Sequence, residues 1–225
     1  MLKVAMDVEE RRGSFLMSWW AGNGAARVIA RTDDAVLLER ATGKRSLTEL
    51  SRCGQDDQAT QIICETIARL HQSHAGPPPE LISLERWFDG LRAAATRDNG
   101  IFARSATMAE SLLSEPLDTT VLHGDIHHGN ILDFGQRGWL AIDPKGLIGE
   151  RYFDYANLFC NPDTAPSHFK RRLDVVAAAA ILDRTRLLQW IASWAALSAA
   201  WFLEEGMSPQ SRITIAEMAL EELAD

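Results

Sequence analysis

Residues 121–144 read VLHGDIHHGNILDFGQRGWLAIDP, and this stretch decides the fold. It holds three histidines, three aspartates and one asparagine. Two kinds of site compete for such a set. Histidine nitrogens with a carboxylate suit a transition metal, whereas carboxylates with an amide oxygen suit Mg²⁺ and the activation of a hydroxyl group.

The metal-site alternative depends on the pattern H-x-D-x-H-H, formed by His123, Asp125, His127 and His128. On an extended segment, residues 123, 125 and 127 would share one face. The sequence offers no distant ligand set to complete the site. The other histidines have no carboxylate at a ligand-like spacing: His71, His74 and His168. A metal-dependent hydrolase is therefore the weakest hypothesis.

The second interpretation starts from Asp125 and Asn130, whose spacing D-x-x-x-x-N is that of a kinase catalytic loop. A predicted hairpin follows, with NILDF and GWLAID flanking the turn GQRG, and Asp143 ends its second strand. Phosphoryl transfer needs a carboxylate beside the acceptor hydroxyl and hard oxygen ligands for Mg²⁺. D-x-x-x-x-N alone arises often by chance, but the whole arrangement predicts phosphoryl transfer.

Composition narrows the class of protein. The chain has 225 residues, of which 46% are hydrophobic, which is enough for a real core. A formal net charge of −8 argues against a nucleic-acid partner. Its three cysteines form no C-x-x-C pair, which predicts neither a disulfide framework nor a cysteine zinc site. The beginning of the sequence lacks a signal-like apolar segment, so we expect a cytoplasmic protein.

Hydrophobic periodicity predicts a mainly helical chain with few strands. Strands are expected at residues 27–30 and 36–38, and the window 122–142 alone in the second half has strand character. The apolar run 187–203 is too short for a membrane span and predicts a buried helix. The predicted helices are 8–20, one in SLTELSR, one in DDQATQIICETIARLHQSH, 84–95, 108–113, 170–182, 184–204 and 212–223.

The motif LHGDIHHGNIL, followed by AIDPKGLIGERYFDYANL, resembles the aminoglycoside phosphotransferases. It is most similar to the aminoglycoside/hydroxyurea antibiotic resistance kinase family, which includes streptomycin 6-phosphotransferases. The likeness extends over the chain through LKVAM, WWAGNGAARVIA, AVLLERATG, IARLH and SAAW. It implies an α+β, protein-kinase-like fold of two lobes: a partial N-lobe and hinge at 1–42, and a helical C-lobe with the catalytic hairpin at 43–225.

The resemblance also implies a function: an ATP-dependent phosphotransferase acting on an alcohol group. Its acceptor would be an aminoglycoside such as streptomycin, or a related sugar or cyclitol, and so a cationic small molecule rather than a nucleic acid or membrane. ATP and Mg²⁺ would be the cofactors. Asp125 would be the catalytic base and His127 a helper near the γ-phosphate, while Asn130 and Asp143 would bind Mg²⁺.

Nucleotide-binding roles follow from the same resemblance. Lys3 would bind the α- and β-phosphates, with Glu10 or Glu9 as its helix partner. Asp154 would support the catalytic loop, and His123 would be structural. The backbone of the hinge residues would meet the adenine edge: Glu39, Arg40 and Ala41.

The acceptor side is less specified by the resemblance. The tryptophans Trp190, Trp194 and Trp201 have helical spacing and are predicted core residues, and some of them could also wall the acceptor pocket. Glu204 and Glu205 are candidates to meet a cationic acceptor.

One departure from the family concerns the small lobe. Family members carry about two strands and a glycine-rich loop ahead of the lysine strand, whereas this sequence opens two residues before Lys3. We therefore expect an incomplete small lobe. A catalytically impaired nucleotide-binding remnant is the alternative, although the presence of Asp125, Asn130 and Asp143 favours an active kinase.

Overall fold

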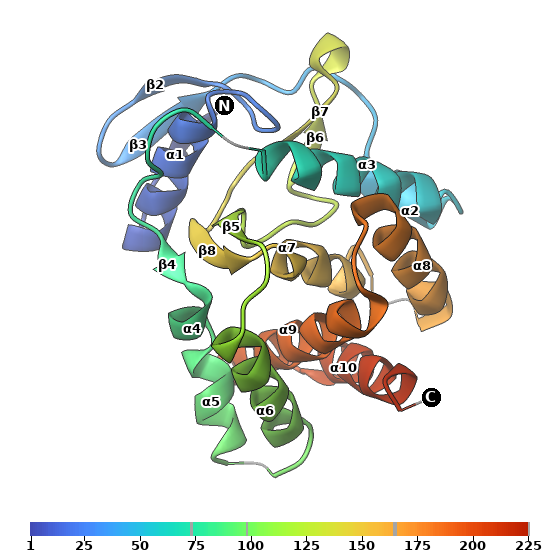
Figure 1. Ribbon diagram of the computed structural model, residues 1–225. Coiled ribbons are helices and arrows are strands. Elements are labelled where there is room, and N and C mark those ends of the chain that lie inside the picture. Colours follow the sequence, from blue (N-terminus) through green and yellow to red (C-terminus); the bar gives the residue numbers. More distant parts are fainter. Residues whose placement is uncertain (73, 98, 164–165, 225) are drawn as a thin grey trace.

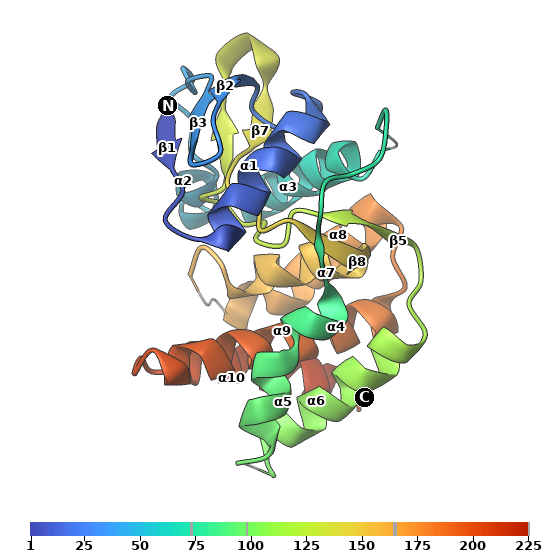
Figure 2. The ribbon, with the colours of Figure 1, turned by 90° about the vertical axis from the view of Figure 1, so that its left-hand side faces the viewer.

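The computed structural model describes residues 1–72, 74–97, 99–163 and 166–224. In this part of the chain helices predominate, and the strands form three small sheets (Figure 1). The side view places the N-terminal sheet with α1 (Val8–Trp20) at one end of the molecule and the helices of residues 89–114 and 184–222 at the other (Figure 2).

The N-terminal sheet is antiparallel, in the order β1-β3-β2, and Lys3 pairs with Val36. Its strands are β1 (Leu2–Val4), β2 (Val28–Arg31) and β3 (Ala35–Leu38). Helix α1 (Val8–Trp20) begins after Asp7, whose carboxylate accepts a hydrogen bond from the backbone N–H of Glu10 and so caps the helix.

The predicted hairpin consists of β6 (Ile131–Asp133) and β7 (Trp139–Ala141), paired antiparallel. Ala141 also exchanges backbone hydrogen bonds of 2.9 Å with Gly24 and Ala26, so the hairpin is joined to the N-terminal segment. This link brings the end of the hairpin beside the sheet that carries β1.

A third sheet has the order β4-β8-β5. Its strands are β4 (Ile82–Ser83), β5 (Thr119–Leu122) and β8 (Leu147–Glu150). The loop that contains Asp125 follows β5, and β8 follows the hairpin, so the antiparallel pairing of β5 with β8 fixes both ends of the segment that holds the candidate site residues.

The described chain contains further helices. They are α2 (Leu47–Arg52), α3 (Asp56–Leu70), α4 (Leu84–Trp87), α5 (Asp89–Ala95), α6 (Ile101–Ser114), α7 (Tyr152–Ala156), α8 (Phe169–Ala180), α9 (Arg184–Glu204) and α10 (Gln210–Glu222). Short 3-10 turns occupy Gly135–Arg137, Asn157–Cys160 and Pro166–His168. Helix α9 packs against α5, α6, α7 and α10 and is the central helix of this group (Figure 1).

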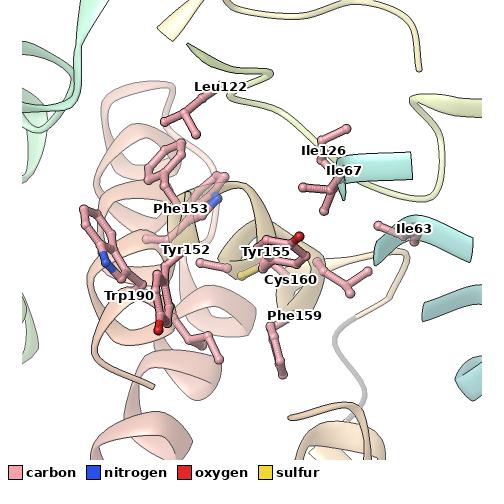
Figure 3. Packing of buried hydrophobic residues seen from close by; sticks show 14 of the residues in the cluster. Ile63, Ile67, Leu122, Ile126, Tyr152, Phe153, Tyr155, Phe159, Cys160 and Trp190 are labelled. Carbon is pink, nitrogen blue, oxygen red and sulfur yellow. The ribbon is translucent and has the colours of Figure 1, made fainter. Parts of the chain in front are cut away.

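The core continues under the loop that contains Asp125. Ile126 is fully buried and lies against Ile67 of α3, while Phe153 faces Trp190 on the other side of the cluster (Figure 3). The rings of Phe153 and Trp190 meet edge to face, 5.9 Å apart. Burying Ile126 anchors the loop between Asp125 and His127.

The structure confirms several predicted elements and corrects others. The helices predicted at 8–20 and 184–204 match α1 and α9. The helix predicted at 84–95 is wrong, because it is broken at Phe88 between α4 and α5. The restriction of strands to 122–142 is also wrong, because β4, β5 and β8 extend beyond that window. The apolar run 187–203 lies in α9, and no described helix is long and apolar enough to cross a membrane.

Candidate active site

The loop between β5 and β6 is held from behind by Asp154 of α7. Its carboxylate accepts hydrogen bonds from the backbone N–H groups of His123 (2.9 Å) and Gly124 (2.8 Å). His71 Nε2 lies 2.8 Å from the same carboxylate. Burial alone would raise the pKa of Asp154, but the hydrogen bond with His71, the neighbouring histidines and the backbone hydrogen bond from Gly124 together lower the pKa. Asp154 therefore stays ionised and fixes the backbone ahead of Asp125.

His123 is buried and both of its ring nitrogens are occupied. Nε2 lies 2.8 Å from the carbonyl oxygen of Ile142 and donates to it, while Nδ1 accepts from the backbone N–H of Asp125 at 3.2 Å. Burial lowers the pKa of His123, so the ring is neutral. Its lone pair is used within the loop, and no group of three or more His, Cys, Asp or Glu side chains among the described residues is placed to hold a metal ion. The hydrolase hypothesis therefore has no ligand set.

Asp125 projects from this loop with its carboxylate held by two amides. Asn157 Nδ2 donates to Oδ1 at 3.0 Å, and Asn130 Nδ2 donates to Oδ2 at 3.3 Å and to the backbone oxygen of Asp125 at 2.9 Å. The side chain remains 31% exposed. Asp125 is thus oriented and still reachable by a substrate. The sequence pattern did not single out Asn157, although this residue lies in the motif ERYFDYANL.

His127 lies beside Asp125, with 3.9 Å between Nε2 and Oδ1. Its Nδ1 accepts from the backbone N–H of Gly129 at 3.0 Å, so the neutral ring carries its hydrogen on Nε2, toward Asp125. Burial lowers the pKa of His127, and the charges of Asp125 and Asp143 only partly oppose this. His127 is therefore a neutral hydrogen-bond donor at neutral pH.

The hairpin brings Asn130 and Asp143 to adjacent strand ends, as the sequence predicts. The backbone N–H of Ile142 donates to the carbonyl oxygen of Asn130 at 2.9 Å. Asp143 has a φ of 64°, in the left-handed region that costs a non-glycine residue free energy. Its carboxylate is 45% exposed and forms an ion pair with Lys3. This backbone conformation directs the carboxylate toward the N-terminal sheet.

Helix α1 supplies two neighbouring carboxylates to two different lysines. Glu10 Oε1 lies 3.5 Å from Lys3 Nζ, and Glu9 Oε1 lies 2.6 Å from Lys145 Nζ. Glu10 is therefore the partner of Lys3, a choice that the sequence leaves open. Burial alone would lower the pKa of Lys145, but the hydrogen bond to Glu9 and the surrounding negative charge raise it.

The segment 39–41 follows β3. The backbone N–H of Glu39 donates to the carbonyl oxygen of Arg27 at 3.0 Å, and its carboxylate pairs with Arg137. Glu39 therefore uses its own N–H within the protein. Any hydrogen bond from a backbone N–H of this segment to a ligand would come from Arg40 or Ala41.

A cavity of about 440 Å³ opens in front of Asp125. Its aromatic wall contains Trp87, Trp194, Trp201 and Phe202, and its polar lining includes Glu9, Asp125, His127, Lys145, Asn157, Glu205 and Arg212. Gly124, Cys160, Asn161 and Ser198 complete it. The nucleotide-site candidates lie outside this lining: Lys3, Glu10, Glu39, Arg40, Ala41, Asn130 and Asp143.

Some of the residues predicted to contact the acceptor line the cavity, and others do not. Trp194 and Trp201 line the cavity, with ring centroids 5.7 Å apart, whereas Trp190 is buried and donates from Nε1 to Glu150. Glu205 lines the cavity and Glu204 does not. The lining is therefore an aromatic wall with scattered charges.

A loop that presents Asp125, followed by a hairpin with Asn130 and Asp143 at its ends, lies beneath a small sheet that carries Lys3, and this arrangement defines a phosphotransferase of the protein-kinase-like class. Solved structures support this fold. A choline/ethanolamine kinase family protein from Mesorhizobium loti aligns with a TM-score of 0.77 and 14% identity over 99% of this chain and 83% of its own. Aminoglycoside phosphotransferase APH(3'')-Id from Streptomyces rimosus, in complex with ADP and streptomycin, aligns with a TM-score of 0.58 and 21% identity over 84% of this chain and 80% of its own.

The chain belongs to the aminoglycoside/hydroxyurea antibiotic resistance kinase family, whose model matches residues 1–206. It is 48% identical to a streptomycin 3''-kinase from Klebsiella pneumoniae over 92% of this chain and 80% of that protein. A streptomycin 6-kinase from Streptomyces griseus is 29% identical over 96% of this chain and 75% of its own. The predicted family, fold class and phosphotransferase activity are thereby confirmed.

Proposed function

We propose that the protein is an ATP-dependent kinase that phosphorylates a hydroxyl group of streptomycin or a closely related aminoglycoside. The observation that carries this proposal is the Asp125 carboxylate, held by Asn130 and Asn157 at the edge of a 440 Å³ cavity. The greater identity to a streptomycin 3''-kinase than to a 6-kinase favours the 3''-hydroxyl as the position modified.

Asp125 would act as the general base. A hydroxyl placed in the cavity would donate its hydrogen bond to the carboxylate and lose its proton there as its oxygen attacks the γ-phosphorus. His127 would donate from Nε2 to a phosphoryl oxygen or to Asp125, because its other nitrogen already accepts from Gly129. Asn157 would hold the carboxylate in place.

Asn130 and Asp143 would hold Mg²⁺. The amide nitrogen of Asn130 donates to Asp125, which leaves the amide oxygen to face a cation, and the exposed carboxylate of Asp143 is a second hard donor. These residues therefore fit the ion, which when bound supplies positive charge to the phosphate oxygens. Lys3, steadied by Glu10, would bind the α- and β-phosphates.

The backbone of residues 39–41 would contact the adenine edge, mainly through Arg40 and Ala41. We place the N-lobe and hinge at 1–42 and the C-lobe at 43–225, and we expect the protein in the cytoplasm, where ATP is available.

The cavity suits a cationic, hydroxyl-rich acceptor. It contains three carboxylates, from Glu9, Asp125 and Glu205, and two cations, from Lys145 and Arg212. Aromatic faces attract guanidinium groups by cation–π interaction, worth roughly 0.5–2 kcal/mol. A cation would therefore bind along the aromatic wall toward Glu205 while a hydroxyl reaches Asp125.

The test is ATP consumption by the purified protein with a panel of aminoglycosides and with choline, each with Mg²⁺. We expect turnover with streptomycin and a product that carries one phosphoryl group, whose position NMR assigns. Turnover with choline and with none of the aminoglycosides would contradict the proposed acceptor. Mg-ATP binding without turnover on any acceptor would favour the impaired remnant instead.

A further inference from the structure

Lys145 occupies a defined place against the catalytic loop. Its backbone N–H donates to the carbonyl oxygen of His123 at 2.7 Å. Its Cβ lies 3.0 Å from where a Cβ on Gly124 would be, so the two segments are in close contact. Gly146, with a φ of 73°, turns the chain immediately afterwards. The side chain of Lys145 is thus directed by backbone geometry into the cavity that Asp125 also lines.

The two lysines paired with α1 lie on different sides of the hairpin end. Lys3 pairs with Asp143 and lies outside the lining of the cavity, whereas Lys145 lines it together with Asp125. Glu9 holds Lys145 Nζ at 2.6 Å, and the side chain remains 34% exposed. A single helix therefore positions one cation on the nucleotide side and another on the acceptor side.

Electrostatics explains why a cation is needed at this place. During transfer, negative charge is spread over three oxygens of the phosphoryl group, and catalysis depends on groups that neutralise it. The Asp125 carboxylate repels that charge from the acceptor side. The other cation of the cavity, Arg212, lies over the ring of Phe202, 4.4 Å from its centroid, on the wall formed by α9 and α10. Lys145, in contrast, is held against the loop that contains Asp125 by the hydrogen bond from its backbone N–H to His123.

We propose that Lys145 is a catalytic residue that binds an oxygen of the transferred phosphoryl group from the acceptor side. This inference rests on the proposed phosphotransfer function. The acceptor oxygen forms a bond to the γ-phosphorus, the bond from phosphorus to the β–γ bridging oxygen breaks, and ADP leaves with that electron pair. The hydroxyl proton passes to Asp125, while the Lys145 ammonium keeps its protons and donates a hydrogen bond throughout.

The experiment compares Lys145→Met and Lys145→Arg with a matched control, Lys170→Met. Lys170 is an exposed lysine that also pairs with a carboxylate, Glu222, but lies on α8. For Lys145→Met we expect kcat to fall about 10- to 100-fold, somewhat less than for a fully buried donor because the side chain is partly exposed. KM for ATP should change little, the Arg variant should recover part of kcat, and the control should match the wild type.

A second measurement separates catalysis from structural damage. Mg-ADP with aluminium fluoride mimics the transferring phosphoryl group, whereas AMP-PNP mimics the ground state. Lys145→Met should weaken the first complex and leave the second nearly unchanged, because a transition-state contact acts differentially. Should the Met variant not fold, as judged by circular dichroism, Lys145→Gln replaces it.

Two outcomes would overturn the role of Lys145: a kcat within about twofold of the wild type, or equal losses of both complexes. The wild type reports separately on the proposed function through its turnover on the acceptor panel. If the wild type phosphorylates none of these acceptors, the proposed acceptor fails, whereas the two affinities still test whether Lys145 contacts the transferring phosphoryl group.

Discussion

Gly13 lies in the middle of α1, where helix propensity alone favours alanine by about 0.5–1 kcal/mol. The structure predicts the opposite effect for Gly13→Ala. A Cβ at this position would lie 2.2 Å from the carbonyl oxygen of Pro144, and real contacts essentially never fall below 3.0 Å. The helix and the segment after β7 would therefore have to separate by at least 0.8 Å.

That separation acts on stability and on the site together. Overpacking costs typically about 1–3 kcal/mol, so after the gain in propensity we expect a net loss of about 1–2 kcal/mol. For a chain of this size the loss corresponds to a Tm lower by roughly 2–8 °C. Because α1 carries Glu9 and Glu10, the shift also displaces Lys145 and Lys3. A displacement near 1 Å can cost about 10²-fold in rate, so kcat/KM should fall at least about tenfold.

The assay is thermal unfolding combined with steady-state kinetics. Ser18→Ala is the control: it lies on the same helix, adds no atoms, and loses only a bond from Oγ to the carbonyl oxygen of Ser14. It should change stability by less than about 0.5 kcal/mol. A Gly13→Ala variant that is more stable than the wild type and fully active would refute the close packing of α1 on Pro144.

Three further predictions concern the acceptor wall, the hairpin and the nucleotide side. Trp201→Ala should raise KM for the acceptor about tenfold, with a smaller effect on KM for ATP. The reason is that the Trp201 side chain lines the cavity and packs edge-on against Trp87, with ring centroids 5.4 Å apart. Titrations of the acceptor at fixed ATP measure KM for the acceptor. The Arg45 guanidinium holds the pKa of Asp133 at about 2, below the ordinary value of 3.8. The ion pair therefore stabilises the fold above pH 3.8, and this stabilisation is lost as the pH falls through 2. The variant Asp133→Asn should show a flatter dependence of Tm on pH between these two values, and a slope equal to that of the wild type would contradict this prediction. Lys3→Met should raise KM for ATP about tenfold or more while KM for the acceptor stays constant, and equal changes in the two constants would place Lys3 elsewhere.

The sequence specified those parts of the fold that depend on local patterns. Helix α1 follows an N-cap aspartate, and α9 has a continuous apolar pattern after Asp183, which caps it by accepting from the backbone N–H of Arg186. The hairpin was readable because GQRG separates two apolar runs. Asn130 and Asp143 lie at the two ends of that hairpin, so their proximity follows from it.

What the sequence missed depends on contacts between distant residues. Strand β8 contains a glycine and the buried Glu150, an unusual composition for a strand. The carboxylate of Glu150 accepts hydrogen bonds from Arg186 and Trp190 of α9 and from the backbone N–H of Leu117, all of which lie far from it in the sequence. The break at Phe88 accompanies its burial between Phe153 and Trp190, each 6.0 Å from its ring. Tertiary packing overrides helix propensity at this point.

The candidate site also depends on contacts that the sequence alone does not reveal. The motif located Asp125 and Asn130, but the second amide that orients the carboxylate, Asn157, comes from another segment and could have been found only by asking what holds the carboxylate. The assignment of Glu10 to Lys3 and of Glu9 to Lys145 required the direction in which α1 faces the hairpin. Helical positions 9 and 10 differ by about 100°, which the sequence cannot orient toward a partner.

The central claim is that Asp125 accepts the proton of the acceptor hydroxyl, and the single-turnover rate of phosphoryl transfer in Asp125→Asn tests it most directly. With Mg-ATP and acceptor both saturating, we predict a rate lower than that of the wild type by about 10²–10⁴-fold, with Mg-ATP affinity unchanged. The asparagine keeps the shape of the side chain and removes the base. A single-turnover rate equal to that of the wild type would contradict the account.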